Sequence, residues 1–189
     1  MELLHSREAT SEQFQQVQRW IQTALVRDPD SADLLFQMGN AAHLAGNYAD
    51  AETMYRRAIE KASQPSLTIL ASNELALLVA LHRHQPEEAI QLMNQAIQLS
   101  GPLSFLLDTR ATVYLAAGDA ASAIQDLEPA IADTPSAANK FHLAQAHFLA
   151  GDVVAAGVAW RESMGLGLHL KGIHPLERSV FEELNSKLK

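Results

Sequence analysis

Small and large side chains recur along the chain with nearly constant spacing, and this periodicity restricts the fold more than any other feature. The clearest copy occupies residues 31–62, where one pattern spans two predicted helices: Leu35, Met38, Gly39, Gly46, Ala51, Tyr55 and Ala58. Two series of mostly small residues repeat at steps of 34, 38, 34 and 33: Val17, Ala51, Ala89, Ala123 and Ala156, and Ala24, Ala58, Ala96, Ala130 and Ser163. Because both series keep one register, the sequence predicts a stack of helix pairs.

The pattern resembles the tetratricopeptide repeat (TPR), and the chain is identified on these residues as a member of that family. The phrases LLDTRATVYLAAGD (residues 106–119) and IHPLERSVFEEL (residues 173–184) are similar to the closing segments of long bacterial TPR proteins. The resemblance implies an all-α fold, a right-handed superhelical solenoid of antiparallel helix pairs. Either the first repeat is degenerate, or the chain is a C-terminal fragment of a longer repeat protein.

The predicted organisation is a single solenoid domain over residues 1–189, with about ten helices and no sheet. It comprises a partial repeat, four full repeats and a capping helix, at residues 11–31, 32–65, 66–102, 103–136, 137–168 and 175–189. The longest step adds four residues between Lys61 and Ser72, which predicts a helix about one turn longer there. Leu77 and His84 replace small residues of the pattern, and Pro129 is expected to bend its helix.

Composition and charge exclude several classes of function. With 48% hydrophobic residues the chain is not disordered, and 22 acidic against 14 basic residues give a net charge of -8 that repels a nucleic-acid backbone. The absence of cysteine excludes disulfides and thiolate chemistry. No signal peptide is evident, and the longest apolar run, residues 75–81, is too short to span a bilayer. We expect a soluble protein without a nucleic-acid partner or membrane insertion; its compartment stays open, with the cytoplasm favoured.

In this family the first helices of successive repeats line a concave groove, and the resemblance assigns partner binding to positions along these helices. The assigned residues are Asp33, Phe36, Asn40, His43, Glu74, Leu78, His82, Phe105, Asp108, Thr112, Phe141, Gln145 and Phe148. Their apolar and acidic mixture suits an extended or helical segment with large apolar side chains and one or two Lys or Arg. Phe105 and Phe141 are predicted to be exposed as aromatic anchors, although some groove positions can equally belong to the core.

One binding mode of the family is disfavoured. The carboxylate clamp that holds the acidic tails of heat-shock proteins needs Lys, Asn and Arg at set groove positions. Four of these positions hold Phe36, Leu75, Phe105 and Thr109, and only Asn40 agrees with the clamp. A receptor for such tails is therefore not expected.

The sequence carries no catalytic motif. None of the eight histidines forms an i, i+4 pair, and no HExxH motif is present, so no metal site is predicted. Gly165 and Gly167 lack the preceding strand and the following Lys of a phosphate loop, and they are interpreted as a helix terminator. We predict a protein that is not an enzyme and needs no cofactor.

Two hypotheses of function follow. The first is a non-catalytic interaction module, a scaffold or adaptor that binds a segment of another protein. The alternative is a structural unit that assembles with itself by stacking its open first repeat. In both cases residues 175–189 are predicted to cap the stack, burying Leu176, Val180, Phe181 and Leu184.

Overall fold

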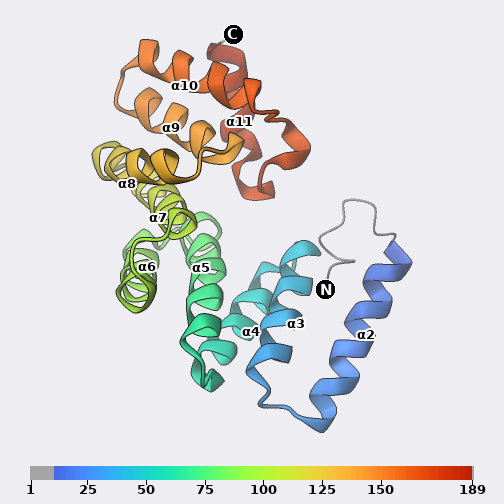
Figure 1. Ribbon diagram of the computed structural model, residues 1–189. Coiled ribbons are helices and arrows are strands. Elements are labelled where there is room, and N and C mark those ends of the chain that lie inside the picture. Colours follow the sequence, from blue (N-terminus) through green and yellow to red (C-terminus); the bar gives the residue numbers. More distant parts are fainter. Residues whose placement is uncertain (1–10, 189) are drawn as a thin grey trace. The chain divides into compact units, whose positions relative to one another are not determined.

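The computed structural model describes residues 11–188, and these residues form ten α-helices, two short 3₁₀ helices and no strand (Figure 1). The predicted all-α fold of repeated helix pairs is therefore confirmed. The helices are α2 (Ser11–Arg27), α3 (Ala32–Leu44), α4 (Tyr48–Lys61), α5 (Pro65–Leu81), α6 (Pro86–Ser100), α7 (Ser104–Ala116), α8 (Ala120–Asp133), α9 (Ala137–Leu149), α10 (Val153–Gly165), η1 (Leu170–Gly172), η2 (Pro175–Glu177) and α11 (Arg178–Lys187).

The chain divides into two compact units, and the boundary between them falls after Leu78, within α5. In the first unit α3 and α4 form an antiparallel pair, and α2 packs against α3 (Figure 1). Two clusters of buried side chains form its core: Val17, Ile21 and Ala41, and Leu35, Ala58 and Ala71.

The close approach of α3 to α4 depends on Gly39. A Cβ atom at this position would lie 2.6 Å from both Cδ1 and Cε1 of Tyr55, closer than packed carbon atoms can approach. The Tyr55 ring is fully buried, so it has no free space into which to retreat. The absence of a side chain on α3 therefore lets the ring lie directly against the helix.

In the second unit α7 pairs with α8 and α9 pairs with α10, while α6 packs against α7 and α8 against α9. One buried cluster joins the α7–α8 pair to α9: Ala111, Leu115, Ala123, Leu127 and Ala146. A second cluster lies between the α9–α10 pair and the C-terminal segment, where Phe181 and Leu184 of α11 are buried with Phe141 and Trp160. The C-terminal segment thus covers the last helix pair.

The residues that set the repeat register are buried in every pair. On the second helices they are Ala51, Tyr55 and Ala58; Ala89, Met93 and Ala96; Ala123, Leu127 and Ala130; and Ala156, Trp160 and Ser163. The long repeat step has the predicted cause, because α5 has 17 residues where α3, α7 and α9 each have 13. Pro129 lies inside α8, which runs through it without interruption.

The turns within the pairs each contain a residue with positive φ. Gly46, Gly118 and Gly151 have φ of 77°, 79° and 83°, and His84 occupies the equivalent turn with φ of 55°. A left-handed conformation costs an L-residue about 1–2 kcal/mol because its Cβ crowds the following carbonyl oxygen. His84 therefore carries backbone strain that glycine avoids in the other turns.

Substituting His84→Gly is expected to raise the free energy of unfolding by about 1 kcal/mol, since glycine relieves this strain. Gly118→Ala is the matched control, because no atom lies within 4 Å of its added Cβ and only backbone strain changes. The control is expected to lower stability by about 1 kcal/mol. Thermal unfolding followed by circular dichroism measures both, and an unchanged melting temperature for His84→Gly contradicts the assignment of strain.

Candidate functional site

The predicted groove residues fall on the first helices of the pairs, with one exception. Asp33, Phe36, Asn40 and His43 lie on α3, while Glu74 and Leu78 lie on α5. On the second unit's helices, Phe105, Asp108 and Thr112 lie on α7, and Phe141, Gln145 and Phe148 lie on α9. His82 was predicted to be helical but lies in the turn after α5, which ends at Leu81. The turn that contains His84 begins at position 82, and α5 therefore ends at Leu81.

In the first unit three of the predicted residues meet around a hydroxyl group. The Tyr55 hydroxyl donates a 2.8 Å hydrogen bond to Asn40 Oδ1 and lies 3.4 Å from His43 Nδ1. Glu74 Oε2 lies 3.7 Å from the same nitrogen of His43. Burial, and then the charge of Glu74, raise the pKa of Tyr55, so this hydroxyl stays protonated and able to donate.

An aromatic contact extends this polar cluster. The rings of Phe36 and Tyr55 are tilted against each other with centroids 5.8 Å apart. Phe36 is one of the predicted groove residues, whereas Tyr55 enters the sequence argument only as a member of the repeat pattern. The signal that distinguishes Tyr55 is its hydroxyl, because the equivalent positions hold Met93, Leu127 and Trp160.

In the second unit the predicted residues differ widely in exposure. Phe105 is 45% exposed at the start of α7. Thr112 is buried, and its Oγ1 donates to the backbone oxygen of Asp108 at 3.1 Å. The Gln145 Oε1 atom is buried and makes no hydrogen bond with the described residues. Phe148 is half-buried, with the Lys187 ammonium group 5.0 Å from its ring centroid.

The prediction that Phe141 is an exposed anchor is wrong. Its side chain is fully buried, with ring centroids 6.3 Å from Trp160 and 6.2 Å from Phe181. The physical reason is the C-terminal helix α11, which covers this part of α9 and excludes water from the ring. Leu78 on α5 is also fully buried, and it contributes to the core.

His142, which is not one of the predicted groove residues, is buried among charged side chains of the second unit. His142 Nδ1 is 2.7 Å from Asp108 Oδ1, and its Nε2 is 3.2 Å from Glu177 Oε1. Burial opposes the charged imidazole, but the two carboxylates outweigh it and raise the pKa of His142 well above the ordinary histidine value. The groove residue Asp108 is thereby connected to the C-terminal segment.

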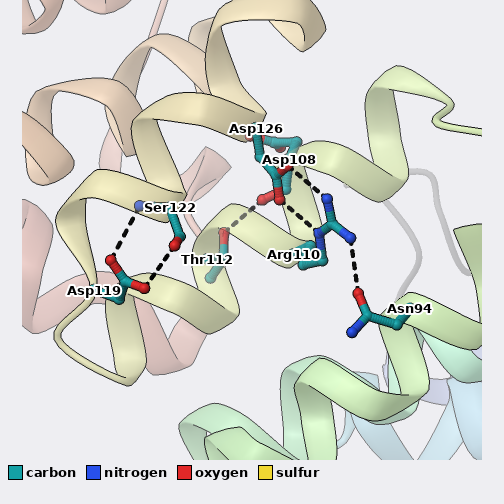
Figure 2. A network of polar contacts seen from close by, with 7 residues as sticks. All are labelled: Asn94, Asp108, Arg110, Thr112, Asp119, Ser122 and Asp126. Atoms are coloured by element: carbon teal, nitrogen blue, oxygen red, sulfur yellow. Dashed lines mark hydrogen bonds and ion pairs between the residues drawn. The ribbon is translucent and has the colours of Figure 1, made fainter.

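A second charged contact connects three helices of this unit, as Figure 2 shows. Arg110 of α7 donates from Nε and Nη2 to the two carboxylate oxygens of Asp126 on α8, both at 2.7 Å. Its Nη1 donates to Asn94 Oδ1 of α6 at 2.8 Å. In the repeat register Arg110 and Asp126 take the positions of Met38 and Met54. A bidentate ion pair thus stands where another repeat has two apolar side chains.

Within residues 11–188 no group of three His, Asp or Glu side chains is placed to hold a metal ion. None of the helices described is both long and apolar enough to cross a bilayer.

The sequence matches a family model described as Tetratricopeptide repeat over residues 11–66 and 109–162, together more than half of the chain. The crystal structure of TTC0263, a thermophilic TPR protein in Thermus thermophilus, is similar at a TM-score of 0.69 and 15% identity, covering 94% of this chain and 91% of that chain. MamA 41-end from Desulfovibrio magneticus RS-1 gives a TM-score of 0.68 at 16% identity, and the match covers 82% of this chain and 85% of that chain. A chain of the APC/C hetero-tetramer Cut9–Hcn1 gives a TM-score of 0.71 at 16% identity. The match covers 94% of this chain and 34% of that chain.

No curated protein sequence matches this chain significantly. At the identities of the solved structures, the similarity shows the fold.

The Arg110–Asp126 pair generates a test of how this repeat is held together. Arg110→Met leaves the buried Asp126 carboxylate without its partner and is expected to lower the free energy of unfolding by about 3 kcal/mol. The double variant Arg110→Met/Asp126→Met reproduces the residues of the α3–α4 pair and is expected to recover stability to within about 1 kcal/mol of the parent. Urea denaturation measures these differences. A double variant as unstable as the single one contradicts the account.

Proposed function

Because the chain belongs to the tetratricopeptide repeat family, we propose that it is a non-catalytic interaction module that binds an extended or helical segment of another protein. The family and the fold are those of protein-interaction scaffolds in general. One of the similar structures is a chain of a Cut9–Hcn1 hetero-tetramer, so that protein assembles with another. Helical repeats present preformed surfaces, which bind a partner segment without first paying an ordering cost.

The observation that carries the proposal is the exposure of Phe105. It is a large aromatic side chain, 45% exposed, on a first helix whose neighbouring residues Leu106 and Leu107 are buried. Aromatic side chains dominate the binding energy of many interfaces because they bury a large area with few rotatable bonds. We assign Phe105 as the anchor of the second unit's binding face.

Gln145 adds a polar contact to this face. It occupies on α9 the repeat position that Thr112 occupies on α7, and these two helices are in contact. Its buried Oε1 atom accepts no hydrogen bond from the described residues, and such an acceptor is stabilised when a donor reaches it. Because this atom is covered in the free protein, a backbone N–H, Lys or Arg of the bound segment would supply that donor once the Gln145 side chain turns toward it.

The first unit offers a similar face by itself. Phe36, Asn40 and His43 on α3 lie beside Tyr55, and the Glu74 side chain is about a third exposed. Asp33 is exposed at the start of α3. With the net charge of -8, these carboxylates favour a partner that combines apolar side chains with Lys or Arg.

Self-assembly is the second candidate function, and the α2 helix favours it. Trp20 is 61% exposed, although its equivalents Met54, Leu92, Asp126 and Ala159 are all buried or half-buried. A helix from a second copy would bury this indole ring. Light scattering over a dilution series separates the candidates, because self-assembly predicts a mass that rises with concentration and that Trp20→Gln suppresses.

Substituting Phe105→Ala is expected to weaken partner capture by about 1–3 kcal/mol, because it removes the proposed anchor without disturbing the core. Leu99→Ala is the control, since Leu99 is similarly exposed but lies on α6, a second helix. Quantitative affinity capture from a lysate of the source, followed by titration of the captured protein, measures the effect. Equal capture by the parent, Phe105→Ala and Leu99→Ala excludes this face as the binding site.

A further inference from the structure

The C-terminal segment, residues 168–188, lies on the last helix pair through an aromatic contact and a charged one. The ring centroids of Phe181 and Trp160 are 5.3 Å apart, and Phe141 packs against both. Glu177, at the end of η2, brings a carboxylate into the same buried region. A buried carboxylate is strongly unfavourable unless a cation accompanies it, so the docking of this segment depends on what faces Glu177.

The group that faces Glu177 is His142. Its imidazole lies between two carboxylates from different elements, with Nδ1 at 2.7 Å from Asp108 Oδ1 of α7 and Nε2 at 3.2 Å from Glu177 Oε1. The contact between His142 Nε2 and Glu177 Oε1 is a close ion pair, but its geometry does not meet the criteria of a hydrogen bond. An imidazole can offer protons to both neighbours only when both nitrogens are protonated. The arrangement therefore fits an imidazolium ion.

The other titratable and charged groups near this site do not replace that charge. His174 precedes η2, and burial is the main cause that lowers its pKa, to which Arg178 and His142 also contribute. His174 Nδ1 accepts a hydrogen bond from the backbone N–H of Leu176 at 3.2 Å, as the neutral ring does. On α9 itself, Lys140 pairs with Glu162 of α10. His142 is thus the cation between Asp108 and Glu177.

We propose that residues 174–188 act as a pH-sensitive latch, which stays docked on α9 and α10 while His142 is charged and is released when His142 loses its proton. Release leaves Glu177 and Asp108 without the cation between them, and the two carboxylates then disfavour the closed arrangement. It also uncovers the Phe141–Trp160 face and removes Lys187 from the ring of Phe148. An effect of this release on partner binding rests on the proposed function, but the release itself does not depend on that function.

The sign of the pH dependence follows from the raised pKa of His142. Because the docked state binds the proton more tightly than the released state, the stabilisation is fully present below the ordinary histidine pKa. It is lost as pH rises through the raised pKa of the docked state. The latch is therefore closed at the ordinary histidine pKa and opens as the pH rises through the raised pKa of His142.

Trp160 reports the state of the latch directly. The chain has two tryptophans, so Trp20→Phe leaves Trp160, which is buried against Phe181, as the single tryptophan to be excited selectively. Acrylamide quenching is followed from about pH 6, just below the ordinary histidine pKa, to about pH 10, just below the ordinary lysine pKa. We expect weak quenching at the acid end and a severalfold larger quenching constant at the alkaline end, with little change in helical circular dichroism.

Three further variants on the Trp20→Phe background assign the step to His142. His142→Gln is expected to abolish the pH step, and Glu177→Gln to shift its midpoint to lower pH because one of the two carboxylates is gone. Glu182→Gln removes an exposed carboxylate from α11, the helix that follows η2, and is expected to leave the midpoint unchanged. Amide exchange in α11 relative to α10, measured on the unmodified chain over the same range, repeats the test without substitution.

The outcomes that overturn the latch are distinct from a failure of the proposed function, because no partner is present in the experiment. A flat quenching profile in the Trp20→Phe parent overturns it, as does a step that survives unchanged in His142→Gln. If His142→Gln does not fold, two other results overturn the latch. One is an unshifted midpoint in Glu177→Gln, and the other is a ratio of α11 to α10 amide exchange that stays constant with pH.

Discussion

The contact between Gly39 and the Tyr55 ring is the constraint on which the first unit depends. Because position 39 has no side chain, the ring lies against α3, and α3 and α4 bury Leu35 and Ala58 beneath it. The same approach brings the buried Tyr55 hydroxyl within reach of Asn40 Oδ1, to which it donates a hydrogen bond. A packing requirement thus places the polar groups of the candidate binding face, and the face is rigid because the ring that organises it is fully buried.

The second unit has a charged pair at two repeat positions where the first unit has apolar side chains. Arg110 and Asp126 take positions that hold methionines in the α3–α4 pair, and they connect α7 to α8 through two directed hydrogen bonds. At the end of the stack, the last helix pair would expose Trp160 to water without the C-terminal segment. Apolar burial favours docking, and the His142 imidazolium makes the accompanying burial of Glu177 possible.

Periodic features could be predicted from the sequence, and features that depend on a single side-chain geometry could not. Ala51, Ala89, Ala123 and Ala156 are fully buried as expected, because helix pairing imposes the same spacing in each repeat. Phe141 was misplaced because the periodicity carries no information about α11, which lies beyond the last repeat. The pairing of His142 with Asp108 and Glu177 was missed for the same reason, since it joins a repeat position to the non-repeated segment.

A double-mutant cycle at Gly39 and Tyr55 tests most directly whether the small-to-large contact between paired helices determines this structure. The double variant Gly39→Ala/Tyr55→Leu recreates the Ala111 and Leu127 pair of the third repeat, so the chain supplies its own reference. In the parent, Gly39→Ala is expected to lower the free energy of unfolding by about 1–3 kcal/mol, because its Cβ overlaps the ring. In the Tyr55→Leu background the same substitution is expected to be neutral or to stabilise by up to about 1 kcal/mol, the ordinary gain of alanine over glycine in a helix. An equal loss in both backgrounds contradicts the account.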